Sequence, residues 1–314
     1  MSMKADAETE QANHGPLVSI VITTRNEEHN IGNCLRSVSL QDYTNIEVLV
    51  VDNNSTDQTK LIAQEFNVQV FNLGPERSAQ RNYGLIEIAT GKYGMFIDAD
   101  MVLTPTLVSK CVDEMELNRT FGLHIEEIIL GRKWLSKVRR YERQFYSGTV
   151  IDGIRFFNRE KFVEIGGFDS KLPPGPEDWD LDKRMKLLGN LKLLSNCGTS
   201  LEWTMSDFIR QKGIEHESTY IGIYHNEDEV NLKKYIKKKI YYSESMAYYR
   251  SKWKSSDPDV RKQLGILYRY VFVFTEMGKW RKIVTNPVLF MQVFLLRCLV
   301  GLAYVYTKNG TKNH

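Results

Sequence analysis

The sequence is poor in cysteine, carries little net charge and has no glycine in the polar stretch after its first apolar run. Its four cysteines are far apart and form no Cys-x-x-Cys pair, so we expect reduced thiols, as in a cytosolic protein. The formal net charge is only +3, from 42 basic and 39 acidic residues, which does not indicate a nucleic-acid partner. The sequence also contains no internal repeat.

The first residues, 1–15, are polar and lack the basic start and apolar core of a signal peptide. We therefore expect a disordered tail and a cytoplasmic protein. The whole chain has 314 residues, of which 42% are hydrophobic, and this is enough for one large α/β domain with a helical extension. After residue 230 the sequence is rich in basic residues and has the periodicity of helices. We therefore predict a domain over 16–230 and an extension over 231–314.

Several apolar runs rich in β-branched residues alternate with segments of helical periodicity. The runs cover residues 17–24, 46–51, 68–71 and 93–97. This alternation predicts an open, mostly parallel α/β sheet with flanking helices, in which ligands bind beyond the carboxyl ends of the strands. Polar clusters follow Thr24, Val51 and Ile97, and therefore fall at that edge.

Two carboxylates end the last of these runs, in the sequence Asp98-Ala99-Asp100. Side chains two apart on a strand point the same way, so both acids can face one ligand. Carboxylate oxygens suit Mg²⁺ or Mn²⁺, which bind through one or two carboxylates together with substrate phosphates. The alternative is that the pair consists of solvated loop acids.

A second acidic cluster, Glu177-Asp178-Trp179, follows a proline-rich turn. We expect these residues in a loop ahead of a helix that starts at Asp180. A carboxylate fixed beside an aromatic ring suits a general base that acts on a sugar hydroxyl. Acids at a helix start can instead simply complement the helix dipole, and that reading stays open for Asp180 and Asp182.

Taken together, these motifs resemble those of the inverting family 2 glycosyltransferases with the GT-A fold. The matching segments occur in the order of the family and cover residues 17–226: they are 18–27, 50–59, 79–84, 98–100, 166–169 and 177–181. The resemblance implies a Rossmann-like, mostly parallel central sheet. It also implies transfer of one sugar from a UDP- or GDP-linked donor, with a divalent cation, Mn²⁺ or Mg²⁺, as cofactor.

The resemblance implies a role for each matching residue. Asp178 is expected to be the catalytic base, with Glu177 beside it. The nucleotide-sugar-binding residues are expected to be Thr23, Arg25, Glu27, Asp52, Arg81, Asp98 and Trp179. Asp100 and Asp98 are expected to hold the metal, and His225 is a third candidate, with His216 as its competitor.

The extension suggests contact with a membrane. Residues 233–239 are rich in lysine, and residues 287–306 are apolar except for Gln292 and Arg297. An arginine at the bilayer centre is costly, so we expect a helix that lies in the membrane interface; the alternative is a core helix. The acceptor, through a hydroxyl or a phosphate, would then be a glycan or a polyprenyl- or dolichyl-linked sugar or phosphate, and the protein would lie peripherally at the inner face of the cell membrane.

Three alternatives are weighed against this reading. A protein with the same fold can bind nucleotide sugars without catalysis, although all the expected acids are present here. A sugar nucleotidyltransferase shares the sheet and the metal site, but it normally has a glycine-rich loop, which residues 23–27 lack. Processive polysaccharide synthases of the family carry a Gln-x-x-Arg-Trp motif, which is missing here, so we expect transfer of one sugar at a time.

Overall fold

The computed structural model describes residues 15–172, 174–195, 204–215, 220–244 and 246–310. Its centre is a seven-stranded sheet with the order β3-β2-β1-β4-β8-β6-β9. The four strands from β3 to β4 are parallel, β8 is antiparallel to both β4 and β6, and β9 is parallel to β6. The strands are β1 (Val18–Thr24), β2 (Ile46–Asp52), β3 (Gln69–Asn72), β4 (Tyr93–Asp98), β6 (Gly122–His124), β8 (Ile154–Asn158) and β9 (Leu191–Leu193).

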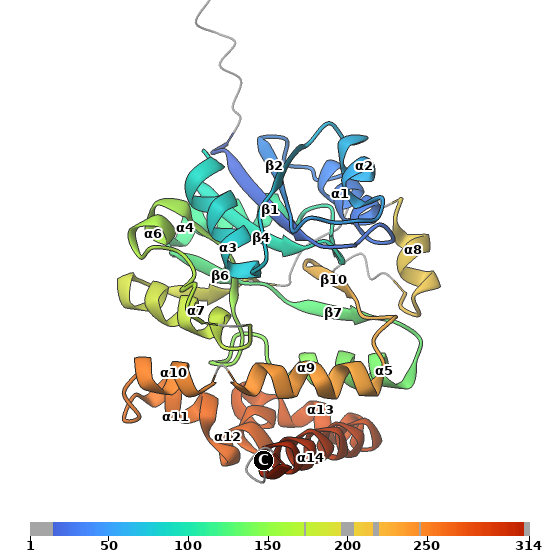
Figure 1. Ribbon diagram of the computed structural model, residues 1–314, viewed down its shortest axis with the longest axis vertical. Coiled ribbons are helices and arrows are strands. Elements are labelled where there is room, and N and C mark those ends of the chain that lie inside the picture. Colours follow the sequence, from blue (N-terminus) through green and yellow to red (C-terminus); the bar gives the residue numbers. More distant parts are fainter. Residues whose placement is uncertain (1–14, 173, 196–203, 216–219, 245, 311–314) are drawn as a thin grey trace, which may run out of the picture.

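Helices cover both faces of this sheet, as its alternating side chains require (Figure 1). On one face Ile20, Val50 and Ile97 pack in one core with α1 (Ile31–Ser39) and α4 (Leu107–Asn118). On the other face Val21 and Phe96 pack in a second core with η1, α6 and α7. These last elements are η1 (Tyr83–Ile88), α6 (Arg159–Glu164) and α7 (Glu177–Leu188). The mostly parallel, doubly covered sheet that the sequence predicted is confirmed.

The register of the central strands brings the polar clusters together. Thr23 pairs with Asp98 across the β1–β4 ladder, and Thr24 pairs with Asp52 across the β1–β2 ladder. Three strand ends therefore lie side by side at one edge of the sheet. Helix α3 (Arg77–Asn82) contacts β1 and β2 and carries Arg81 toward this edge.

A second, three-stranded sheet brings a distant histidine to the same edge. It has the order β5-β10-β7, with β5 (Met101–Leu103), β10 (Ile223–Asn226) and β7 (Glu127–Leu130). His225 of β10 pairs with Met101, the residue directly after Asp100. The fold thus joins residues that are more than 120 positions apart in the sequence, as the hydrogen bond between His225 and Asp100 shows.

Two of the predicted local structures were wrong. Glu177 and Asp178 were expected in a loop, but they are the first two residues of α7, which begins at Glu177 and not at Asp180. The apolar-rich sequence of residues 261–274 likewise predicts one helix. It is divided into α11 (Pro258–Leu264), α12 (Ile266–Tyr270) and the short η2 (Phe272–Phe274), because Gly265 between the first two has an extended backbone.

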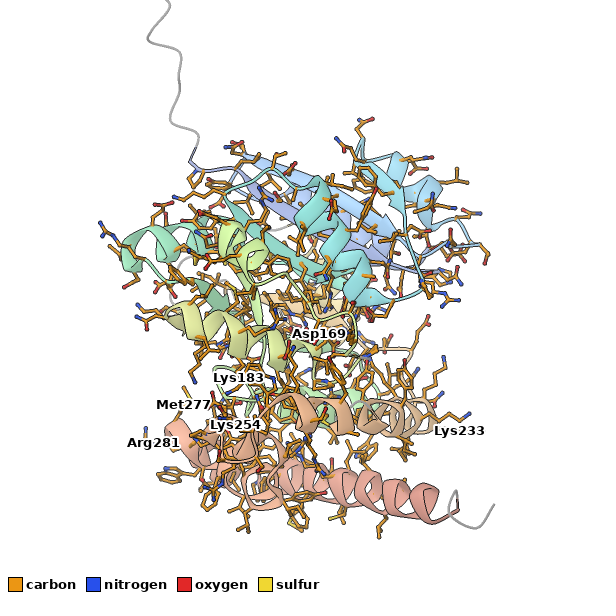
Figure 2. The ribbon with its side chains drawn as sticks, turned by 60° about the vertical axis from the view of Figure 1, so that its left-hand side comes forward. Asp169, Lys183, Lys233, Lys254, Met277 and Arg281 are labelled. Atoms are coloured by element: carbon orange, nitrogen blue, oxygen red, sulfur yellow. The ribbon has the colours of Figure 1, made fainter. Side chains whose placement is uncertain are left out.

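Helices from the end of the chain form a layer below the sheets (Figure 1), and a second view shows the same arrangement (Figure 2). They pack on α5 (Trp134–Arg143), which the sequence analysis did not predict, and share its core. Ion pairs also join this layer to α7, for example Lys183 to Asp257 at 2.5 Å. The layer consists of α9 (Leu232–Glu244), α10 (Met246–Lys252), α11, α12, η2, η3 (Glu276–Gly278), α13 (Trp280–Thr285) and α14 (Pro287–Gly310). The remaining helices are α2 (Thr59–Gln64) and α8 (Ser206–Gln211).

Helix α14 contains the apolar segment that we predicted at a membrane interface. Val293 and Leu296 are buried, and the guanidinium of Arg297 pairs with the carboxylate of Glu142 at 2.9 Å. One face of the helix is thus part of the core, as the alternative reading had it, while Met291 and Leu295 on another face are exposed. None of the helices described here is long and apolar enough to span a membrane.

Candidate functional site

A cavity of about 710 Å³ lies between the carboxyl ends of the strands and helix α9. Its walls come from β1, β4, β7, β10, α5 and the start of α7, so it collects side chains from both sheets. The predicted residues that line it are Thr23, Arg25, Glu27, Asp98, Asp100, Glu177, Asp178, Trp179 and His225. The fold thus brings together nine residues that the sequence analysis selected separately.

An arginine joins two of the predicted acids. The guanidinium of Arg81 donates to Asp98 at 3.0 Å and to Asp178 at 3.2 Å, and it is only 1% exposed. The ring of Phe96 lies 4.3 Å from this guanidinium. Burial alone would raise the pKa of Asp98, but Arg81, Arg77 and Arg155 outweigh it and hold that pKa far below its usual range. Asp98 therefore stays ionised.

Glu177 lies beside this network and has a different role from Asp178. Its carboxylate pairs with Arg77, one helical turn before Arg81, and also accepts a hydrogen bond from the backbone of Gly175. Burial and the neighbouring Asp178 raise the pKa of Glu177, although Arg77 opposes them. Asp178 is more exposed, at 28% of its side chain, and faces the cavity. Of the two acids it is the more accessible from the cavity.

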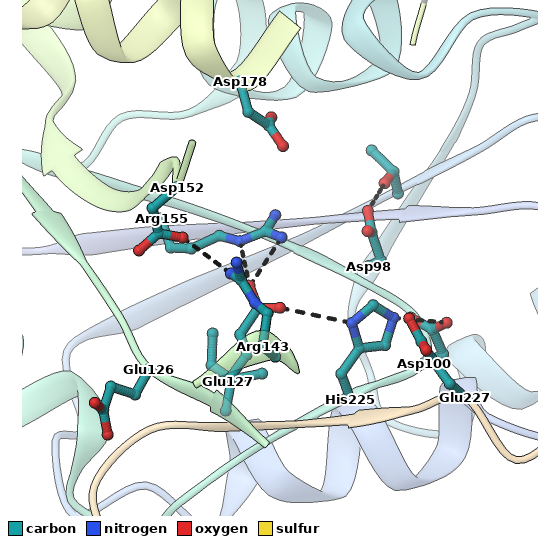
Figure 3. A network of polar contacts seen from close by, with 12 residues as sticks. Asp98, Asp100, Glu126, Glu127, Arg143, Asp152, Arg155, Asp178, His225 and Glu227 are labelled. Atoms are coloured by element: carbon teal, nitrogen blue, oxygen red, sulfur yellow. Dashed lines mark hydrogen bonds and ion pairs between the residues drawn. The ribbon is translucent and has the colours of Figure 1, made fainter. Parts of the chain in front are cut away.

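The second acid of the pair, Asp100, faces His225 (Figure 3). Nε2 of His225 lies 3.2 Å from one carboxylate oxygen of Asp100, and Nδ1 lies 3.7 Å from Glu127. The other carboxylate oxygen of Asp100 is buried and has no hydrogen-bond partner. Burial would lower the pKa of His225, but Asp100 and Glu127 raise it well above its ordinary value.

This arrangement fits a divalent cation. An unpartnered buried carboxylate oxygen is costly, and a cation would satisfy it. A proton donated from Nδ1 to Glu127 would leave Nε2 of His225 free as a ligand, the usual carboxylate support of a metal-binding histidine. Among the described residues no three His, Cys, Asp or Glu side chains are close enough to form a complete site. Substrate phosphates and water would therefore have to complete the coordination shell.

The nucleobase end of the site differs in part from expectation. Thr23 donates to Asp98 at 3.2 Å, and Arg25 is exposed at the cavity. Asp52, expected at the base, is fully buried and is bound by the backbone and hydroxyl of Ser55. Its neighbour Asn53 lines the cavity instead. The role assigned to Asp52 stays a prediction.

Glu27, expected at the nucleobase, lies close enough to Asp98 and Asp100 to interact with both. Burial raises its pKa to about 7, with help from Asp100 and Asp98, while a hydrogen bond from Asn30 opposes the shift. A carboxyl group whose pKa lies near 7 indicates that other acids are close by in a buried site. A cation in the site would offset the repulsion that Glu27 feels from Asp100 and Asp98.

Trp179 lies beside Asp178 at the start of α7. The indole of Trp179 donates to the backbone of Ile151 at 3.1 Å, which fixes the ring beside Asp178. Gly153 also approaches Asp178 closely, because a Cβ atom at Gly153 would lie 2.9 Å from the Cβ of that residue. His216, the competitor of His225, lies outside the described residues.

The sequence analysis missed several charged residues of the cavity. They are Arg77, Glu127, Arg139, Arg143, Arg155 and Glu227. Two signals were present: Arg77 precedes Arg81 by four residues, and Arg139 precedes Arg143 by the same spacing, which places each pair on one helix face. Nothing in the sequence indicated that the second pair would lie under the strand ends.

Comparison with known proteins agrees with this geometry. Residues 19–168 match the family described as Glycosyl transferase family 2. These residues form a family 2 glycosyltransferase domain. The matched stretch of this domain contains Asp98 and Asp100, whereas Asp178 and His225 lie beyond it. The roles of these last two residues therefore rest on the structure and on the motif order.

Relatives of the glycosyltransferase domain support the same class. Glycosyltransferase AglE of Haloferax volcanii is 43% identical over 94 residues, which is 27% of this chain and 31% of that protein. The chain spans about a third of the length of the curated relatives that it matches.

Solved glycosyltransferase structures share the fold over most of the chain. A mannosyltransferase from Pyrobaculum calidifontis, in complex with GDP-Man and Mn²⁺, has a TM-score of 0.55 and 15% identity, and the match covers 96% of this chain and 81% of that chain. TarS of S. aureus, residues 1–349 with UDP, has a TM-score of 0.53 and 17% identity, with coverage of 92% and 87%. At these identities the likeness shows the fold, GT-A with a helical C-terminal part.

Proposed function

We propose that the protein is a metal-dependent inverting glycosyltransferase that moves one sugar from a nucleotide-diphosphate sugar to an acceptor hydroxyl. The observation that carries this proposal is the placement of Asp98, Asp100 and His225 in the same cavity as Asp178. Donor-binding and proton-accepting groups thus share one space of about 710 Å³, large enough for a nucleotide sugar. The family of the domain and the GT-A fold of the chain support the same class.

Asp100, Asp98 and His225 would hold Mn²⁺ or Mg²⁺. Bound there, the cation supplies Lewis-acid stabilisation of the negative charge on the departing nucleoside diphosphate. Nucleotide complexes of the structural neighbours, GDP-Man with Mn²⁺ in one and UDP in the other, support a donor of this type.

Asp178 would accept the proton of the attacking hydroxyl as general base. Arg81 donates to one of its oxygens and so orients the carboxylate, and the space beside it admits only a glycine at position 153. Glu177, fixed by Arg77, would position the donor sugar or the acceptor. Attack by a hydroxyl held at Asp178 on the face opposite the leaving group would invert the anomeric centre.

Titration calorimetry tests this function. We expect UDP or GDP to bind the protein with Mn²⁺ and to bind far more weakly with EDTA. Asp100→Asn should remove the metal dependence, whereas Asp178→Asn should keep nucleotide binding and lose sugar transfer to a membrane lipid extract. Transfer that survives in Asp178→Asn would refute the assigned base. Binding without any transfer in the wild type would favour the inactive nucleotide-sugar-binding alternative.

We also propose that the C-terminal layer docks on an anionic membrane surface, such as the inner face of the cell membrane, where a polyprenyl- or dolichyl-linked acceptor would be presented. Large apolar side chains of this layer are exposed, and so are the cations Arg261, Lys262 and Arg281 of the same layer. Figure 2 labels Arg281 together with the exposed Met277. Apolar surface next to lysine and arginine suits anionic lipid. The apolar residues include Leu267, Phe272, Trp280, Val284, Met291 and Leu295.

Vesicle sedimentation at low salt tests the docking proposal. Truncation of α14 would remove buried Val293 and Leu296, so point changes are preferable. The double variant Val284→Glu with Leu295→Glu should stay in the supernatant with anionic vesicles that sediment the wild type. Leu61→Glu is the matched control, since Leu61 is 65% exposed on α2. Wild-type protein that does not sediment would refute the proposal.

A further inference from the structure

The end of the cavity next to α9 and α12 is rich in cationic side chains. Four cationic side chains from three helices line this end: Arg139 of α5, Lys238 and Lys239 of α9, and Arg269 of α12. Tyrosine and tryptophan rings lie between them. The metal, the donor and the catalytic base of the proposed function use none of these cations.

Two of the cations share one aromatic ring. Arg139 lies 5.1 Å from the ring centre of Tyr235, and the ammonium of Lys239 lies 5.4 Å from it. Arg139 is neutralised, because it pairs with Glu142 at 2.7 Å and with Glu227 at 3.3 Å. Lys239 has no carboxylate within 4 Å in the part of the chain that the structure describes.

Arg269 connects this basic end to the proposed base. Its guanidinium lies 5.6 Å from the ring centre of Trp179, the residue next to Asp178. Its one hydrogen bond in the described structure goes to the backbone of Gln263 at 3.3 Å, and no described carboxylate pairs with it. Burial, together with Arg139 and Arg269, lowers the pKa of Lys239 to about 7, which reflects cations crowded without enough counter-charge.

We propose that Lys239, Arg269 and Lys238 form a subsite for a phosphate group of the acceptor, a phosphate monoester or diester whose hydroxyl reaches Asp178. This inference rests on the proposed glycosyltransferase function and adds the chemical class of the acceptor. A phosphate would supply the counter-charge that these cations lack, and charge-assisted hydrogen bonds from lysine and arginine are the usual way to bind it. The rings of Tyr235 and Trp179 would limit solvent around it.

A neutral acceptor explains the arrangement less well. Sugar hydroxyls are bound through carboxylates, amides and ring faces, and they cannot neutralise several cations gathered in a partly buried space. The diphosphate of the donor is the other candidate anion. It is expected at the strand ends, where the cation held by Asp98 and Asp100 would bind it.

The test measures phosphate binding while the donor site is filled. The protein is saturated with Mn²⁺ and with UDP or GDP, whichever binds, and is then titrated with glycerol 3-phosphate and, separately, with citronellyl phosphate. We expect Lys239→Met to weaken binding of at least one probe by about tenfold or more, since a hydrogen bond to a charged group contributes that much. Lys239→Arg should restore most of the affinity.

Lys237→Met is the matched control. Lys237 is an exposed lysine of the same helix and does not line the cavity. Its loss should leave both affinities unchanged, and an equal effect of Lys237→Met and Lys239→Met would overturn the proposal as non-specific attraction. Failure of both probes to bind would also overturn it. Displacement of the nucleotide by the probes would do the same, because it would place the phosphate in the donor site.

The two probes separate the sources of the phosphate. Tighter binding of citronellyl phosphate supports a lipid-linked phosphate, and equal binding supports a water-soluble one. The proposed function fails in a different way, namely when neither nucleotide binds with Mn²⁺. In that case the probes are titrated without nucleotide, and a loss of affinity in Lys239→Met alone still supports the phosphate subsite.

Discussion

Removal of Arg81 is the sharpest test of how the site is held together. Its guanidinium is 1% exposed and bonds both Asp98 and Asp178, so Arg81→Met leaves two acids without their shared partner. Breaking a buried pair costs about 3–5 kcal/mol. We expect about 3 kcal/mol, the low end, because the two acid side chains are 22% and 28% exposed and water screens them in part.

Urea unfolding at neutral pH, followed by circular dichroism, measures this loss. The double variant Arg81→Met with Asp98→Asn should recover part of the stability, since it also removes one of the stranded charges. Methionine keeps most of the contact with the neighbouring phenylalanine rings, so packing alone does not explain the effect. A loss below about 1 kcal/mol, or strictly additive single changes, would refute the reasoning.

The same variant should show a characteristic pH dependence. In the wild type the pKa of Asp98 is depressed in the folded state, in which Arg81 and Arg77 oppose the effect of burial. The resulting stabilisation is complete above the unfolded pKa of about 3.9 and is lost as the pH falls through the folded value. The stability gap between wild type and Arg81→Met should therefore shrink in acid. A gap that stays constant below about pH 4 would point to a purely steric cause.

Three further predictions concern other parts of the fold. Asp182, 2.5 Å from His124, outweighs burial and raises the pKa of His124 above 6.5. The free energy of unfolding that this pair contributes is therefore complete below pH 6.5 and is lost as the pH rises through the pKa of the folded state. In His124→Asn, urea unfolding should show no such decline with pH, and a pH profile like that of the wild type would contradict this reasoning. Gly153→Ala should displace Asp178 and lower kcat by about tenfold to 100-fold, with nucleotide affinity in calorimetry unchanged; normal turnover would disprove the contact. Arg297→Met should lower the free energy of unfolding by about 1.5–3 kcal/mol, because the buried carboxylate of Glu142 loses one of its two arginine partners and keeps Arg139; a neutral result would show that the pair with Arg297 does not contribute to stability.

Much of the central sheet could be predicted because its strands are buried on both faces and therefore read as continuous apolar runs. The same rule placed Thr23, Asp98 and Asp100 at the carboxyl edge, and the register confirmed that Thr23 and Asp98 are neighbours. Helix α7 was predicted to begin at Asp180 but begins at Glu177. The prolines before it indicate a turn, but they do not determine which residue begins the helix.

What the sequence could not show is how distant charges pair. The partners of Arg81 lie 17 and 97 residues away, and those of His225 lie about 100 residues away or more. No local pattern encodes such pairings, because they depend on how two sheets and the C-terminal layer meet. The basic end of the cavity was hidden for the same reason, since its cations come from three separate helices.

The pairing of Arg81 with both Asp98 and Asp178 couples the two acids electrostatically. Because one guanidinium serves both Asp98 and Asp178, a change of charge at either acid alters the field at the other. Such coupling is reciprocal in binding free energy: whatever donor occupancy does to acceptor affinity, acceptor occupancy does to donor affinity by the same factor. If Asp98 serves the donor and Asp178 the acceptor, as proposed above, Arg81 links the two binding events thermodynamically, and donor and acceptor affinities measured separately and together would show the coupling.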